Sequence, residues 1–227
     1  MTGFFDRFKS GNTLFYPGCL AKHSLKSIAN NYAEILKRLG IDFILLKDNE
    51  VCCGYPALSL GYRNEFEDLK IKNDDVFRRA NIKRIITSCP SCYLIFKKAY
   101  PNLKVEHITQ VIARHLKELP VKYEEKLTYY DPPNLARKAG IVNEPRAILE
   151  ALGYEVIELE NNKEFTECCG AGGGLRHNLP QISNKIAKNL LAKVKTPKLI
   201  TTDPLCYVHL KENSQKIEIL ELSQVLV

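Results

Sequence analysis

Eight cysteines carry most of the chemistry that this sequence offers, and they fall into two sets of similar spacing. The first set consists of Cys19, the adjacent pair Cys52 and Cys53 followed by glycine, and the Cys-Pro-Ser-Cys run from Cys89 to Cys92. The second set is smaller and consists of Cys168, Cys169 and Cys206. Thiolates from several loops of one chain are the usual ligands of iron–sulfur clusters. The pattern therefore predicts bound iron and sulfide, above all in the first half of the chain.

The residues around the first set favour metal binding over a disulfide. A disulfide between the neighbours Cys52 and Cys53 would close a small, strained ring, whereas the pair can present two sulfurs to adjacent metal atoms. Gly54 lets the backbone approach closely. Cys89 and Cys92 are expected to end a strand and to open a helix. The free N–H groups and the positive dipole end of that helix would stabilise thiolates and an anionic cluster.

Two other interpretations of the cysteines stay open at this point. A Cys-x-x-Cys run between a strand and a helix is also typical of a metal-free thiol oxidoreductase of thioredoxin type, although that chemistry leaves Cys19 and the adjacent pair without a role. A structural zinc site would make the protein a non-catalytic, metal-stabilised scaffold. Zinc needs only four thiolates, however, and the first set has five.

The composition is that of an ordinary globular protein and excludes several classes of function. The 227 residues are 45% hydrophobic and 26% charged, which allows an ample core. No apolar run is long enough to span a bilayer, and residues 1–9 lack the regions of a secretory signal. We therefore expect a cytoplasmic protein whose thiols stay reduced. The net charge of +7 is spread over both halves without a nucleic-acid-binding motif, so nucleic acid is not an expected partner.

The elements that must position the cysteines repeat along the chain. Apolar residues at helical spacing run from Ile28 to Leu39 and end at Gly40, and Pro145 is expected to open a helix in the second half. Short apolar runs predict strands at 14–16, 43–46, 84–87, 127–130, 154–159 and 199–202. Strands that alternate with helices predict an α/β fold, made of two duplicated parallel-sheet halves. The cysteine-bearing loops at the carboxyl ends of the strands would converge on a cluster site.

The repeat also predicts how the chain divides into domains. A polar segment near residues 120–126 separates the copies. We therefore expect a first α/β domain over 1–120, which holds the complete five-cysteine set, and a second over 121–227, which holds the degenerate set.

Cys19, the Cys52-Cys53-Gly54 element and the Cys89-Pro-Ser-Cys92 run, with their partial repeat, resemble the cysteine-rich CCG domain family. This family includes the B subunit of heterodisulfide reductase. It also includes the iron–sulfur subunits of glycolate oxidase, lactate utilisation and anaerobic glycerol-3-phosphate dehydrogenase complexes. The resemblance covers almost the whole chain and implies a non-cubane [4Fe-4S] cluster. By this resemblance, the five ligands of the cluster would be Cys19, Cys52, Cys53, Cys89 and Cys92.

The resemblance further implies the iron–sulfur subunit of an oxidoreductase complex. In such a complex the cluster would exchange electrons with a small disulfide or thiol, or with a flavoprotein dehydrogenase of a hydroxy-acid pathway. The chain lacks the cysteine run of a ferredoxin domain. We therefore expect redox partner subunits, of ferredoxin type or flavoproteins, and peripheral membrane association through these partners.

The second half departs from the family pattern. Pro133 and Asp203 stand where Cys19 and Cys89 stand in the first half, so the same five-thiolate cluster is not expected there. Cys168, Cys169 and Cys206 are then either remnants or the ligands of a second iron–sulfur or other metal site, which Asp203, His177 or His209 would complete. The expected role of Asp203 is to cap the helix that follows it.

Overall fold

Two parallel β-sheets form the framework of residues 11–227, the part of the chain that the computed structural model describes. The first sheet has the order β1-β2-β3, with β1 at Asn12–Tyr16, β2 at Ile82–Thr87 and β3 at Lys104–His107. The second has the order β5-β4-β6-β7, with β4 at Lys126–Tyr130, β5 at Glu155–Ile157, β6 at Lys198–Thr201 and β7 at Glu218–Glu221. This arrangement confirms the predicted α/β fold. The expectation about a secretory signal concerns residues 1–9, which lie outside the described residues.

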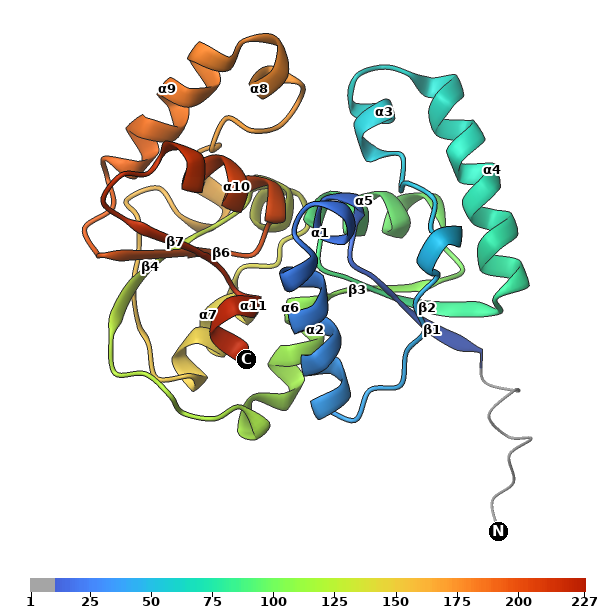
Figure 1. Ribbon diagram of the computed structural model, residues 1–227, viewed down its shortest axis with the longest axis horizontal. Coiled ribbons are helices and arrows are strands. Elements are labelled where there is room, and N and C mark those ends of the chain that lie inside the picture. The colour runs from blue at the N-terminus through green and yellow to red at the C-terminus, as the bar shows by residue number, and fades with distance from the viewer. Residues whose placement is uncertain (1–10) are drawn as a thin grey trace.

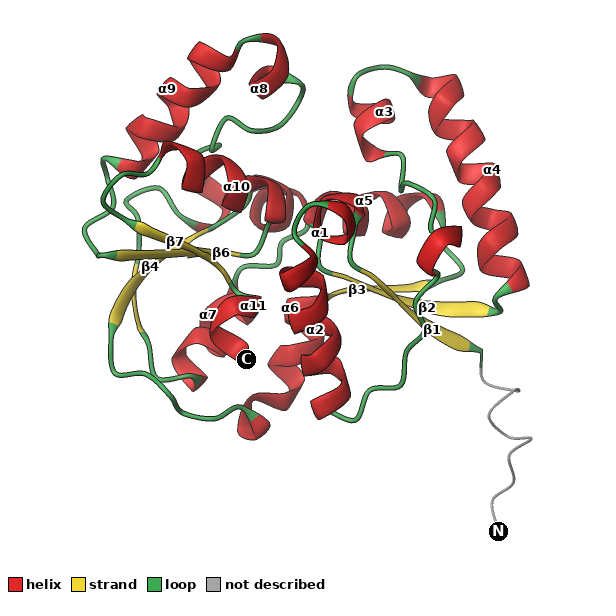
Figure 2. Cartoon of the chain, viewed as in Figure 1, coloured by secondary structure: helices red, strands yellow, loops and turns green. Residues whose placement is uncertain are grey.

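Helices connect the strands and cover the sheets on both sides (Figures 1 and 2). Those of the first half are α1 (Cys19–His23), α2 (Lys26–Arg38), η2 (Lys47–Asn49), α3 (Tyr55–Ser59), α4 (Arg63–Arg79), α5 (Pro90–Ala99), α6 (Ile108–Ile112) and η3 (Ala113–Glu118). Those of the second half are η4 (Asn134–Lys138), α7 (Asn143–Ala151), η5 (Lys163–Phe165), α8 (Leu175–Asn178), α9 (Pro180–Leu191), α10 (Pro204–Asn213) and α11 (Ser223–Leu226). None of the helices in residues 11–227 combines the length and the apolar character needed to cross a membrane.

The strand predicted at 43–46 does not form. Only Ile44 pairs with the first sheet, through a bridge to Leu14, because the chain turns into η2 three residues later. In the first sheet, Ile44 lies next to β1, in the position that β5 has next to β4 in the second sheet. Both sheets therefore have the same order of positions, as expected of a duplication.

The repeat also includes two strands that the sequence pattern does not predict. These are β3 and β7, each the last strand of its sheet. Charged residues interrupt both of these four-residue strands and hide their apolar pattern. Each strand leads into a short helix with the same cap: the Gln110 side chain accepts the N–H of His107 at 3.1 Å, and Gln224 accepts that of Glu221 at 2.9 Å. The two copies thus end in the same local structure.

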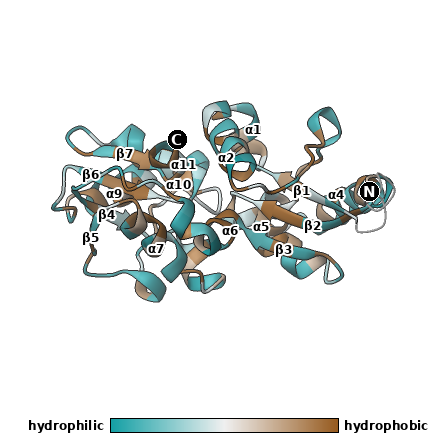
Figure 3. Cartoon of the chain, turned by 90° about the horizontal axis from the view of Figure 1, so that it is seen from below, coloured by the Kyte–Doolittle hydropathy of each residue, from teal (hydrophilic) through white to brown (hydrophobic). Residues whose placement is uncertain are grey.

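One hydrophobic core crosses from the first half into the second. Phe15, Ile28 and Tyr32 belong to the same buried cluster as Leu127 and Leu149. In Figure 1, α2, α6, α7 and α11 gather between the two sheets, and Figure 3 shows apolar strands surrounded by polar helix surfaces. The division into 1–120 and 121–227 stays a prediction, but the shared core joins the two parts.

Glu221 is a buried carboxyl group at the place where the halves meet. It accepts hydrogen bonds from the Tyr32 hydroxyl at 2.6 Å and from the Ser223 backbone N–H at 2.8 Å. Burial raises its pKa from 4.5 to about 7. The folded chain therefore keeps a proton that the unfolded chain releases. The resulting stabilisation is complete below the unfolded pKa and is lost as the pH rises through the folded pKa.

We expect Glu221→Gln to remove this pH dependence. As the pH rises from about 5 to about 8, the free energy of unfolding of the natural chain should fall by roughly 3 kcal/mol relative to the variant, since each pKa unit is worth about 1.4 kcal/mol. Urea unfolding of both chains across this range measures the difference. A constant difference at every pH would contradict a raised pKa at Glu221.

Candidate metal centre

Loops at one edge of the first sheet carry the first cysteine set. Cys19 begins α1 just after β1 ends, and Cys89 follows β2 and is the residue immediately before α5. Cys92 lies in the first turn of α5, as its spacing from Cys89 predicts. In a parallel sheet the loops that follow the strands meet at the same edge. The fold therefore brings these sulfurs to the loop that carries Cys52 and Cys53.

Contacts connect all five thiols of the first half. Cys19 lies close enough to Cys52, the covalent neighbour of Cys53, for each thiol to shift the pKa of the other. The Cys92 thiol donates to the Cys53 sulfur at 3.3 Å, and Cys89 lies close enough to Cys92 to raise its pKa. Cys53 and Cys92 are buried, Cys52 and Cys89 are half-buried, and Cys19 is exposed. The group therefore reaches from the interior to the surface.

The chemistry of this donor set fits a multinuclear metal group. Interactions with Cys19 and Cys53 lower the pKa of the Cys52 thiol far below its ordinary value. The pKa of the Cys92 thiol is raised instead, by its interactions with Cys53 and Cys89 and by burial. Five neighbouring thiols cannot all ionise unless positive charge balances them, and iron supplies such charge.

The contacts between the thiols differ from those of a mononuclear site. Within residues 11–227, no three His, Cys, Asp or Glu side chains are arranged to hold a single metal ion. Two thiolates on one tetrahedral metal lie about 3.8 Å apart, and the 3.3 Å between Cys53 and Cys92 is the shorter distance of a shared proton. This S···S distance therefore does not correspond to two ligands of one metal ion.

Two glycines make room for the cysteine loops. Gly18 has a φ of +86°, and a side chain there would place its Cβ 3.0 Å from the Cβ of Cys89. Gly54 has a φ of +84°, and a Cβ there would lie 2.7 Å from the Phe66 ring. A positive φ favours glycine, and the close neighbour of Gly54 is the Phe66 ring; the approach of this backbone to a metal group stays a prediction.

Two buried polar side chains that the sequence does not single out hold the loop of the adjacent cysteines. The Tyr16 hydroxyl donates to the carbonyl of Val51, and the Asn73 amide donates to the carbonyl of Cys52, each at 2.9 Å. Tyr130 makes the same bond in the second half, to the carbonyl of Glu167 at 2.8 Å. The recurrence of tyrosine at the end of both strands is the signal in the sequence that could reveal this role.

The second half repeats the geometry with three thiols. The Cys169 thiol donates to the Cys206 sulfur at 3.0 Å, and both residues are buried, whereas Cys168 is exposed. The Gly170 N–H donates to the Cys168 sulfur at 3.4 Å, as Gly54 does to Cys52 at 3.5 Å. The local structure of the motif is therefore preserved without the full donor set.

Other residues take the places of the two lost cysteines. The Asp203 side chain accepts the N–H of Leu205 at 2.8 Å and caps α10, as predicted. Pro133 immediately precedes η4, at the position that Cys19 has after β1. His209 is held by Ser183, with its Nε2 3.0 Å from the hydroxyl oxygen, and His177 is exposed on α8.

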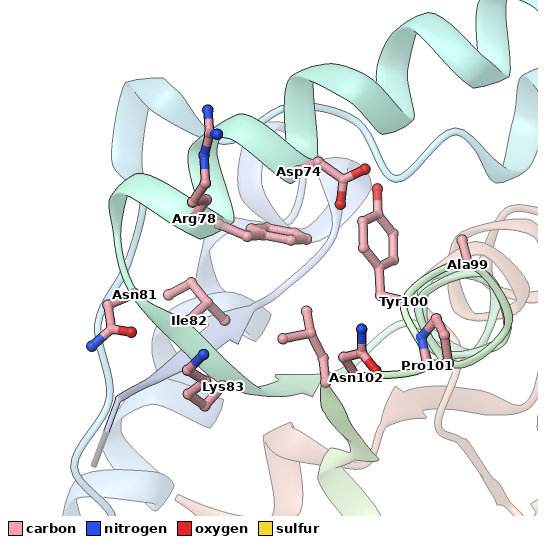
Figure 4. A pocket seen from close by; sticks show the side chains of 11 residues that line it. Asp74, Arg78, Asn81, Ile82, Lys83, Ala99, Tyr100, Pro101 and Asn102 are labelled. Carbon is pink, nitrogen blue, oxygen red and sulfur yellow. The ribbon is translucent and has the colours of Figure 1, made fainter. Parts of the chain in front are cut away.

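A cavity of about 370 Å³ lies at the opposite edge of the first sheet, near the amino ends of β2 and β3. Asp74, Arg78, Lys83 and Tyr100 are among the side chains that line it (Figure 4). The length of the strands separates this cavity from the cysteine loops. It is therefore not part of the candidate metal centre.

A comparison with models of known protein families matches both halves of the chain. The model of the cysteine-rich domain CCG matches residues 13–97 and 127–211, two segments that contain all eight cysteines. The chain belongs to this cysteine-rich CCG domain family, which confirms the resemblance seen in the sequence.

Three relatives match the chain over almost its whole length. It is 32% identical over 212 residues to an uncharacterized iron–sulfur protein of Methanocaldococcus jannaschii, covering 90% of this chain and 42% of that protein. It is 32% identical over 213 residues to the B subunit of the fumarate reductase (CoM/CoB) of Methanothermobacter marburgensis, covering 89% and 42%. It is 26% identical over 235 residues to the D subunit of the dihydromethanophenazine:CoB–CoM heterodisulfide reductase of Methanosarcina acetivorans, covering 95% and 58%. The chain thus spans about half the length of the curated relatives it matches.

Proposed function

We propose that this chain is an iron–sulfur subunit of an oxidoreductase complex and is similar to the B subunit of heterodisulfide reductase. Its first half would hold a non-cubane [4Fe-4S] cluster through Cys19, Cys52, Cys53, Cys89 and Cys92. The observation that carries this proposal is the grouping of five thiols from three loops at one edge of the first sheet. Membership of a family with named iron–sulfur proteins supports it.

The positions of the ligands fit electron transfer. A bound cluster of this type takes up and releases single electrons. Cys53 and Cys92 would anchor it in the interior, and the amino end of α5 would stabilise its negative charge. Cys19 lies on the exposed side. This is the side from which we expect a disulfide, a thiol or a redox partner to approach.

The wider setting of the chain belongs to the same proposal. Components of a fumarate reductase and of a heterodisulfide reductase are among its relatives, so we propose partner subunits of ferredoxin type or flavoproteins. Membrane association would then be peripheral and through these partners. All eight cysteines are free of disulfides. We propose the cytoplasm as the compartment, because it keeps such thiols reduced.

Metal analysis of the anaerobically purified chain tests the proposal. We expect about four irons and four sulfides per chain, with visible absorbance that a reductant bleaches. Zinc without sulfide would contradict the proposal and favour a structural module. A colourless, metal-free chain that reduces disulfides would contradict it as well, in favour of thiol chemistry at Cys89 and Cys92.

A further inference from the structure

A groove of about 460 Å³ runs along α5, between α3 of the first half and η4 of the second. The side chains that matter for its chemistry are Tyr55, Leu58, Leu94, Lys97, Lys98 and Lys138. Tyr55 follows the Cys52-Cys53-Gly54 element, and α5 begins within the Cys89–Cys92 run. The groove therefore borders two of the cysteine loops.

The second half completes this groove. The Asn134 amide of η4 donates to the Ser91 hydroxyl at 3.0 Å, and its oxygen accepts the Tyr55 hydroxyl at 3.2 Å. Lys138 also donates to the Tyr55 hydroxyl, at 3.3 Å. The loop that has lost its cysteine is thus fixed to both neighbouring cysteine loops, and it supplies one of the three cations.

The positive charge of the groove is not neutralised. Among the described residues, no carboxylate forms an ion pair with Lys97, Lys98 or Lys138; Lys97 donates instead to the Tyr93 hydroxyl at 3.0 Å. The second half differs at the equivalent place, where Glu212 stands at the position of Lys98. The carboxylate of Glu212 accepts two hydrogen bonds from Arg176, at 2.6 and 2.7 Å. Lys211, at the position of Lys97, likewise donates to a tyrosine hydroxyl, so the two halves differ at one position: the first half has the unpaired Lys98 where the second half has a paired glutamate.

We propose that this groove binds a small organic anion. Its acidic group would lie among the three lysines, and its apolar body would pack against Leu58 and Leu94. The volume is typical of a small-molecule site lined by apolar side chains with a few polar groups. This inference assigns a ligand class to the junction of the halves. It does not depend on the cluster.

Fluorine NMR with trifluoromethylbenzoate as the probe tests the proposal, and trifluoromethylbenzyl alcohol serves as the neutral counterpart. We expect the acid to bind, and the alcohol to bind about tenfold more weakly. The double variant Lys98→Gln/Lys138→Gln should weaken binding of the acid about tenfold, because each exposed charge contributes a few-fold. The matched control Lys185→Gln/Lys211→Gln removes the same charge from the second half and should bind the acid as the natural chain does.

Two results would overturn the proposal. One is equal binding of the acid by the natural chain and the Lys98→Gln/Lys138→Gln variant. The other is an equal loss of affinity in the Lys185→Gln/Lys211→Gln control, which would show a general effect of net charge and not a site at the groove. Cys53→Ser should keep its affinity for the probe, so this test and the test of the cluster fail separately.

Discussion

Cys53→Ser should remove the cluster from the first half. Cys53 is buried, is bonded to Cys52 through the chain, and has its sulfur 3.3 Å from that of Cys92. It therefore lies in the middle of the series of thiol contacts. A serine hydroxyl does not replace a soft thiolate as an iron ligand. We expect iron to fall from about four atoms per chain to less than about one, with loss of the visible absorbance.

Cys169→Ser is the matched control for this experiment. Cys169 has the same position in the second half, is equally buried, and contacts Cys206 as Cys53 contacts Cys92. If only the first half holds iron, Cys169→Ser keeps the full amount. Loss of additional metal in this control would assign a second site to Cys168, Cys169 and Cys206. Unchanged iron in Cys53→Ser, with circular dichroism like that of the natural chain, would contradict the ligand assignment.

The arrangement of the cysteines could be predicted because it depends on local features. Alternating strands and helices place the cysteine loops at the carboxyl ends of parallel strands, and a Cys-Pro-x-Cys run after a strand opens a helix. The role of Asp203 follows from the same logic, because an aspartate at this position caps the helix. Each of these expectations needs only residues that lie close together in the sequence.

The features that the sequence does not reveal depend on how the two halves pack. Asn134 and Lys138 contact Tyr55 because η4 packs against α5. No local pattern in the sequence predicts that contact. The bond between Tyr32 and Glu221 likewise joins residues 189 positions apart. β3 and β7 are hidden for a different reason: charged residues break their apolar runs. Strand pairing, not hydrophobic alternation, identifies them.

Arg146→Met should have a large effect on the free energy of unfolding. Arg146 is 7% exposed and donates two hydrogen bonds to Asp131, which is 1% exposed, at 2.9 and 2.7 Å. It also binds Glu158 and lies 5.1 Å from the centre of the Tyr129 ring. Removing one partner of a buried pair leaves the other charge without compensation, which costs about 3–5 kcal/mol. Urea unfolding measures this loss.

The double variant Asp131→Asn/Arg146→Met separates the charge from the packing. The amide introduced at position 131 carries no charge that needs the arginine, and its oxygen can still accept the Lys163 N–H that Asp131 accepts at 2.8 Å. We therefore expect the double variant to be more stable than Arg146→Met alone. An equal loss in both variants would show that the packing of Arg146 over Tyr129 matters more than the ion pair.

We expect the same pair to hold η4 in position. Asp131 immediately precedes the turn into η4, so its anchoring by Arg146 fixes the helix that carries Lys138. Arg146→Met should then weaken binding of trifluoromethylbenzoate even where most of the chain is still folded, and the double variant should recover part of the affinity. Recovered stability without recovered affinity would show that η4 needs the arginine itself. In that case the buried ion pair would be retained for the geometry of the groove and not for the stability of the fold.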